Sequence, residues 1–146
     1  MPEDPTTPDL VELWSRFFEA VNRRDFDAML GFFAPDAVWE TEDTGAVGTF
    51  EGRAAIRGFW QDWWASYEEL RVEQEEILDL GNGVTFSVVN QKARLVGTST
   101  EIRHRNAVVT VWVDGLAVLM RFFSGSSNAD VDEARVAAER LAEERG

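Results

Sequence analysis

Few side chains of this chain combine the chemistry and the setting that catalysis needs. His104 is the single histidine, and its unperturbed pKa of about 6.5 suits a general base. Glu40 and Asn90 are weaker catalytic candidates on predicted strands, and Asn90 could also anchor a ligand carbonyl. Two of them have a plainer explanation. His104 could lie on the surface or in a dimer interface, and Asn90 could lie at the end of a strand in water.

A metal centre is not expected. The chain has one histidine and no cysteine, and scattered carboxylates alone do not make a convincing metal site. The lack of cysteine also excludes disulfides and thiolate chemistry. We therefore expect neither a metal nor another cofactor.

Two arginines could bind an anion. Arg103 and Arg105 alternate along a predicted strand, so their side chains share one face. A guanidinium group suits a planar carboxylate or a phosphate. The alternative is surface ion pairing with the nearby acidic residues Glu73, Glu75 or Glu76.

Aromatic residues crowd the stretch from Leu10 to Glu40 and the helix predicted after it. Such large, flat side chains can line an apolar pocket for a flat ligand, or they can simply fill the core. Because there are more of them than a small core usually needs, we expect some of them to line a pocket. The candidates are Trp14, Phe17, Trp39, Trp60, Trp63 and Phe86.

Composition limits the class of protein. The chain has 146 residues, so we expect one domain at 7–146 after a flexible lead-in at 1–6. A net charge of −13 argues against binding to nucleic acid or to anionic membranes, which attract Lys and Arg. No apolar run approaches the roughly 20 residues of a membrane span. The acidic N-terminus is not a signal peptide, so a cytoplasmic location is expected.

The first half of the chain predicts three helices and one strand. A helix starts at Thr7-Pro8 and carries an apolar stripe to residue 21. A short helix capped by Asp25 follows, and Pro35-Asp36 ends it. We then expect a strand at 37–41, a glycine-punctuated loop at 42–52 and a helix from about 53 to 67.

The second half predicts an antiparallel meander and a last helix. Tight turns at Gly81-Asn82-Gly83 and Asp114-Gly115 indicate hairpins. The expected strands are 70–80, 84–96, 101–113 and 116–123, with a C-terminal helix at 130–145. The fold class is therefore α+β, a cone-shaped roll in which a curved antiparallel sheet wraps around an N-terminal helix layer.

This arrangement resembles the nuclear transport factor 2-like superfamily, specifically its bacterial SnoaL-like branch of polyketide cyclase and ketosteroid isomerase-like proteins. The resemblance rests on FFEAVNRRDFDAMLGFFAPDAVWE at 17–40, FEGRAAIRGFW at 50–60, the alternating segment 107–115, and MRFFSGSSNADVDEARVAAERLAE at 120–143. Members share a shape and differ in function. The resemblance implies a cavity inside the cone and a homodimer paired through the outer sheet face.

The resemblance also maps the catalytic positions of two enzyme classes. Ketosteroid isomerases use an Asp base, a Tyr and a protonated Asp, and the matching positions here are Thr41, Phe17 and Val109. The late-strand Asp of limonene-type epoxide hydrolases falls on Phe122. These replacements lack the required acid, base or donor, so both reactions are disfavoured.

The same match implies which side chains face the cavity. Val109 faces inward by this count, so Arg105 lies at the cavity mouth and His104 turns away unless a bulge intervenes. SnoaL-type cyclases rely on an acidic residue that faces the substrate. Glu40, Glu42 and Asp43 lie near the predicted pocket, but the resemblance does not single out one of them as that residue. The pocket residues added by this reasoning are Thr41, Asn90, Arg105 and Val109.

Two functions remain open. The first is the binding of a small, largely apolar and cyclic molecule in an aromatic-lined cavity, with isomerisation, cyclisation or hydration as candidate reactions. The alternative is a non-catalytic homodimeric interaction module whose cavity is incidental or plugged. Apolar residues on both strand faces, such as Val88 with Val89 and Val108 with Val109, support a buried outer face.

Overall fold

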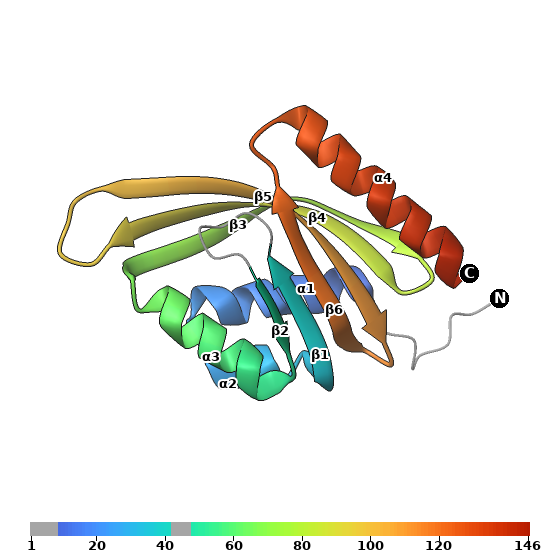
Figure 1. Ribbon diagram of the computed structural model, residues 1–146, viewed down its shortest axis with the longest axis horizontal. Helices are drawn as coiled ribbons and strands as arrows, with labels where there is room; N and C mark the ends of the chain where they lie inside the picture. The colour runs from blue at the N-terminus through green and yellow to red at the C-terminus, as the bar shows by residue number, and fades with distance from the viewer. Residues whose placement is uncertain (1–8, 42–47) are drawn as a thin grey trace.

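The fold is α+β, as the sequence predicts. A computed structural model describes residues 9–41 and 48–146 (Figure 1). Its elements are α1 (Leu10–Asn22), α2 (Phe26–Leu30), β1 (Phe33–Thr41), β2 (Gly48–Glu51), α3 (Arg53–Trp64), β3 (Tyr67–Gly81), β4 (Val84–Leu95), β5 (Glu101–Val113), β6 (Leu116–Ser124) and α4 (Asn128–Arg145).

The strands form one curved, unclosed sheet in the order β2-β1-β6-β5-β4-β3. The meander from β3 to β6 is antiparallel, as expected. The sheet as a whole is mixed, because β1 pairs with β6 in parallel. This corrects the prediction of an antiparallel sheet. After β2, at one edge of the sheet, the chain passes through α3 to β3 at the other edge. It returns through the meander, so β6 arrives beside β1 in the same direction.

Helices cover both faces of the sheet (Figure 1). The N-terminal helices lie on the inner face, where α1, α3 and the sheet enclose an aromatic core. Helix α4 lies on the outer face, where its apolar stripe covers β4, β5 and β6. The stripe consists of Val131, Ala134, Ala138 and Ala142. Small residues at these positions let the helix approach the sheet closely.

Two tight hairpins are confirmed. Gly81 pairs with Val84, and the two residues between them, Asn82 and Gly83, both have positive φ. This is the conformation that two-residue hairpin loops favour. At Gly83 an added Cβ would also lie 2.5 Å from the backbone oxygen of Trp112, so glycine is required there for space as well as for φ.

Several element boundaries differ from the sequence prediction. β1 begins at Phe33 and includes Pro35, which was expected to end a helix. The pairing of β1 with β6 is irregular between Phe33 and Val38, and such an interruption accommodates a proline within a strand. β2 lies inside the predicted loop, and α3 ends at Trp64.

Helix starts are set by caps. The Asp9 side chain accepts a hydrogen bond from the Glu12 backbone nitrogen at 3.2 Å, so α1 begins at Leu10. The predicted start at Thr7-Pro8, the lead-in at 1–6 and the acids Glu42 and Asp43 lie outside the described residues. The Ser127 hydroxyl caps α4 by accepting from the Asp130 nitrogen at 3.1 Å, so this helix starts earlier than predicted.

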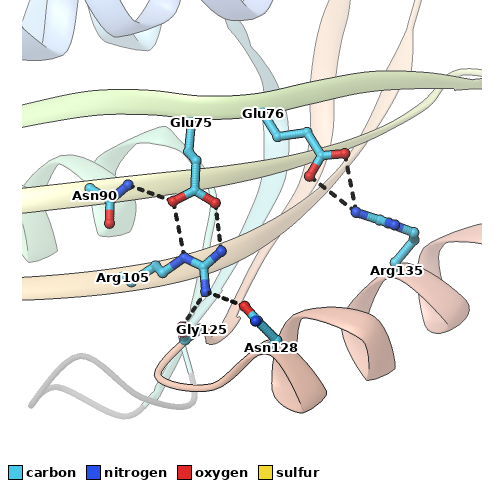
Figure 2. Close-up of polar contacts among 7 residues, drawn as sticks. All are labelled: Glu75, Glu76, Asn90, Arg105, Gly125, Asn128 and Arg135. Carbon is cyan, nitrogen blue, oxygen red and sulfur yellow. Dashed lines mark hydrogen bonds and ion pairs between the residues drawn. The ribbon is translucent and has the colours of Figure 1, made fainter.

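An ion pair on the outer face joins the sheet to the start of α4 (Figure 2). Arg105 donates to Glu75 through Nε at 3.2 Å and Nη2 at 2.5 Å. Its Nη1 donates to the Gly125 carbonyl and to Asn128 Oδ1, each at 3.3 Å. Asn90 Nδ2 also donates to Glu75 at 3.0 Å. These bonds, Arg105 first and then Asn90, hold the pKa of the Glu75 carboxyl below its ordinary value.

Two further contacts hold α4 along its length. Arg135 Nη2 donates to both carboxylate oxygens of Glu76, at 3.1 and 3.0 Å (Figure 2), and its guanidinium carbon lies 5.4 Å from the centre of the Phe86 ring. At the other end, Asn82 Nδ2 donates to the Ala142 carbonyl at 2.7 Å. The helix is therefore attached to the sheet by apolar packing in the middle and by polar contacts at both ends.

Replacing Ala138 with aspartate tests the packing of α4. Ala138 is fully buried against the sheet, so Ala138→Asp would bury an unpaired charge, and we expect a loss of about 3 kcal/mol or more in the free energy of unfolding. Ala137→Asp is the matched control, because the neighbouring Ala137 is exposed and shares the same change in helix propensity, about 0.5 kcal/mol. Equal losses in urea unfolding would contradict the placement of α4.

Acid titration tests the Glu75 pair. A carboxyl whose pKa is lowered in the folded state stabilises the protein above its unfolded pKa, and that contribution is lost as the pH falls through its folded pKa. Between pH 6 and pH 3 we therefore expect Glu75→Gln to lose less stability than the wild type does. The difference should stay below about 1 kcal/mol, because the pair is partly exposed. Glu73→Gln, which removes an exposed carboxylate from the same strand, is the control, and an equal change in both variants would contradict a specific role of the Glu75 pair.

Candidate functional site

An aromatic wall forms where α1, β1 and α3 meet on the inner face of the sheet. Trp14 and Phe17 are one helical turn apart on α1, with ring centres 5.7 Å apart. Trp39 on β1 lies 4.6 Å from Phe122 on β6. On α3, Trp63 stacks nearly parallel to Phe59. Helical and strand periodicity therefore brings residues from distant parts of the sequence to one surface.

This wall surrounds a small cavity. Its free volume is about 40 Å³, enough for a few water molecules, since one needs roughly 10–15 Å³ by this measure. Five of the sequence-predicted pocket residues line it: Trp14, Phe17, Trp39, Thr41 and Trp63. The other lining residues are Phe18, Val21, Met29, Phe59, Trp64, Val72, Val89, Gln91, Val108 and Phe122.

Trp60 fills the core and does not line the cavity. It is fully buried, and its ring lies 5.6 Å from Phe33 and 5.5 Å from Trp39. The prediction that Trp60 lines the pocket is therefore wrong, and the alternative, that it packs in the core, is correct. It supports Trp39, which does line the cavity.

Four predicted pocket residues lie on the other face of the sheet. Phe86 and Val109 pack beneath α4, and Asn90 and Arg105 belong to the outer-face network with Glu75 (Figure 2). The prediction that they face the cavity is wrong. The alternation of side chains along a strand divides its residues between two faces, but it does not determine which face the N-terminal helices cover. Both faces of β4 and β5 are apolar here, and the count from Asp114-Gly115 selected the wrong one.

The arginines are accounted for by ion pairs. Arg105 pairs with Glu75, one of the three acids considered for it. Arg103 pairs instead with Glu101, two residues away on the same strand, at 2.9 Å. Neither arginine is among the residues that line the cavity, so an anion clamp at the cavity mouth is not what their geometry provides.

Glu40 also faces outward. Its carboxylate accepts a hydrogen bond from Arg121 Nε at 2.5 Å, and Arg121 is its register partner on β6. On β1 the neighbours Trp39 and Thr41 line the cavity, so strand alternation turns Glu40 to the opposite face. This placement corrects its candidacy as an acid within the pocket.

His104 lies on the cavity face of the sheet. It pairs in register with Gln91, which lines the cavity. The prediction that His104 turns away from the cavity followed from the predicted inward placement of Val109. Because Val109 faces outward, His104 faces the cavity side, and both predictions are wrong. His104 itself is outside the cavity lining and is partly exposed.

Gln91 is the polar lining residue that sequence reasoning missed. Its Nε2 donates to Asn106 Oδ1 at 3.0 Å, and Asn106 Nδ2 donates to the Phe123 carbonyl at 3.1 Å. Both side chains are buried. The only sequence signal was strand parity: the predicted anchor, Asn90, is the adjacent residue on the outer face.

The cavity is apolar and carries no charge in the described chain. Among its lining residues in 9–41 and 48–146, none is ionisable, and the polar side chains apart from the indoles are Thr41 and Gln91. Within these ranges no group of three or more His, Asp or Glu residues is placed to hold a metal ion. None of the described helices is long and apolar enough to cross a membrane. The described cavity therefore offers shape and apolar contact.

The resemblance matches four residues of this chain to catalytic positions of related enzymes. Phe17, Thr41 and Phe122 all line the cavity, so the resemblance places three of its four catalytic positions on the cavity wall. None of the three can act as an acid or base at neutral pH. Val109 is the exception, because it lies beneath α4.

Solved structures with this fold support the architecture. An NTF2-like protein of unknown function from Burkholderia pseudomallei has a TM-score of 0.73 at 20% identity, covering 90% of this chain and 98% of its own. A putative SnoaL-like polyketide cyclase from Jannaschia has a TM-score of 0.70 at 15% identity, covering 95% and 97%. A Mycobacterium tuberculosis protein in complex with estradiol-17beta-hemisuccinate has a TM-score of 0.66 at 18% identity, covering 77% and 90%. At these identities the similarity shows the fold.

Sequence comparison identifies the family. No curated protein sequence matches the chain at a significant level. The family model of the SnoaL-like domain matches residues 14–120, which run from the first cavity tryptophan to β6. The protein therefore belongs to the SnoaL-like domain family.

Proposed function

We propose that this protein binds a small, flat, largely apolar molecule in the aromatic cavity. The observation that carries the proposal is a free space walled by aromatic rings from α1, β1, α3 and β6. Such rings offer large apolar faces to a planar ligand. Pockets of this kind orient their ligands with a few polar groups, a role that Thr41 and Gln91 fit.

Related folds support a ligand-binding role. The M. tuberculosis protein was crystallised with an estradiol derivative, and another similar structure, TerC, with polyporic acid. A further one, from Catenulispora acidiphila, holds trimethylamine. All three ligands are small molecules, two of them cyclic, which is the class that the aromatic wall favours.

The size of the cavity sets a condition. A free volume of about 40 Å³ is smaller than a single aromatic ring needs, so binding requires lining side chains to move apart. Rotamer changes of this kind are common on binding. Trp63 is suited to such movement, since it is only partly buried, whereas Trp14 is almost fully buried.

The small volume also favours an alternative, in which the aromatic residues are a filled core and the domain is a non-catalytic homodimeric interaction module. Helix α4 already covers Val88 and Val109, so the apolar outer face is accounted for within one chain. A dimer through that face would use the part beyond α4. Sedimentation at micromolar concentration would then show a particle of twice the 16.5 kDa chain mass.

Binding of α-methylstyrene, a single-ring hydrocarbon, tests the proposal through tryptophan fluorescence. We expect saturable binding by the wild type and at least about tenfold weaker binding by Val108→Phe, which fills the cavity from β5. Val113→Phe is the control, because Val113 lies on the same strand and is 42% exposed.

A second variant keeps the test decisive if Val108→Phe fails to fold. Phe17→Ala enlarges the cavity, and an enlarged apolar cavity can take up a small aromatic molecule. Binding by Phe17→Ala together with no binding by the wild type would show a filled core. That result would overturn the proposal and favour the interaction module.

A further inference from the structure

One residue of the described cavity wall reaches the surface. Of the fifteen described residues that line the cavity, fourteen are buried, and the exception is Trp63, which is only partly buried. Its side chain touches the cavity on one side and solvent on the other. Trp63 therefore lies between the cavity and the water outside.

We propose that ligands enter the cavity past Trp63, and that the movement of this ring sets the rate at which they enter and leave. This inference rests on the proposed function, because it assigns the way into the same cavity. With a free volume of about 40 Å³, the cavity takes up a single-ring ligand only after a wall residue moves. The inference identifies Trp63 as the residue that controls this access.

Aromatic contacts hold the Trp63 ring in its closed position. The ring stacks on Phe59, with ring centres 6.1 Å apart and an angle of 7° between the planes. It also makes edge contacts with Trp64 at 5.1 Å and with Tyr67 at 5.8 Å. Each such contact is weak, and changes of side-chain rotamer on binding are common. The ring can therefore leave the closed position without unfolding of the domain.

The place of Trp63 in the fold separates its ring from the fixed backbone around it. α3 ends at Trp64, so Trp63 lies in the last helical turn, where helices open most readily. The backbone beyond it is held, because Arg24 Nη2 donates to the carbonyls of Trp64 and Tyr67 at 2.7 and 3.0 Å. The side chain of Trp63 can therefore turn while the end of the helix stays in place.

Other parts of the described wall are held more firmly. Val89 and Val108 lie on β4 and β5, which have hydrogen-bonded neighbours on both sides in the sheet. Moving these residues would disturb the ladders on both sides of the strand. On α1, Trp14 is almost fully buried, and its ring packs edge-on against Phe18 at 4.8 Å. Entry past Trp63 requires the smallest rearrangement of this wall.

Stopped-flow tryptophan fluorescence with α-methylstyrene tests the entry route, because it gives the association and dissociation rate constants separately. A residue that controls access changes both rate constants in the same direction. A residue that only contacts the bound ligand changes mainly the dissociation rate constant. Both rate constants are independent of the size of the fluorescence signal, which changes when one tryptophan is removed.

We expect Trp63→Leu to raise the association rate constant at least about fivefold, because the smaller side chain no longer closes the cavity and the open form becomes the major one. Phe18→Leu is the matched control. It shortens another aromatic lining residue to the same side chain, but Phe18 is buried. Its association rate constant should stay within about twofold of the wild-type value.

Tyr67→Ala provides a second test that leaves the described lining intact and remains available if Trp63→Leu fails to fold. Tyr67 is partly exposed and touches Trp63 from outside the lining. Loss of this contact should raise both rate constants about two- to tenfold and leave their ratio, the dissociation constant, nearly unchanged. Tyr67→Phe keeps the ring and should retain the wild-type rates.

The outcomes separate the two proposals. If the wild type does not bind α-methylstyrene, the proposed function fails. If it binds, and both Trp63→Leu and Tyr67→Ala associate at the wild-type rate, the binding function stands and the entry route is overturned. An equal acceleration in Phe18→Leu and Trp63→Leu would also overturn the entry route, since any loss of wall volume would then speed entry.

Discussion

The structure depends on two central strands that bury both of their faces. Alternate residues of β4 and β5 belong to two different cores, one under α1 and α3 and the other under α4. Each face needs its own helix layer, because apolar surface left in water destabilises the fold. With both layers in place, the middle of the sheet is a rigid wall, and one side of that wall is the back of the cavity.

Charge distribution follows from this arrangement. Burying a charge without a partner is costly, so the carboxylates of Glu40, Glu75 and Glu76 form their ion pairs on the outer face of the sheet. There they hold α4 in place through Arg105 and Arg135 (Figure 2). The described cavity wall is left almost entirely apolar.

Membership in the SnoaL-like family determines the shape of the site and leaves its chemistry open. Phe17, Thr41 and Phe122, which the resemblance matches to acid and base positions of catalytic relatives, line this cavity. Proton transfer requires a group whose pKa lies near the working pH, and these residues cannot provide one. One architecture supports several functions in this family, so the fold alone leaves the chemistry of this cavity open.

The sequence by itself determined the fold class, both two-residue hairpins and five of the fifteen described residues that line the cavity. Local signals carried these predictions: Asn82-Gly83 and Asp114-Gly115 favour one turn geometry, and the apolar stripe on α1 directs Trp14 and Phe17 inward. Only the tertiary structure decided which face of β4 and β5 meets the cavity. Alternation is symmetric between faces, and both are apolar, so nothing local separates Asn90 from Gln91 or Val108 from Val109. The position of α4 across the sheet breaks that symmetry, and with it Gln91 becomes the inward polar group.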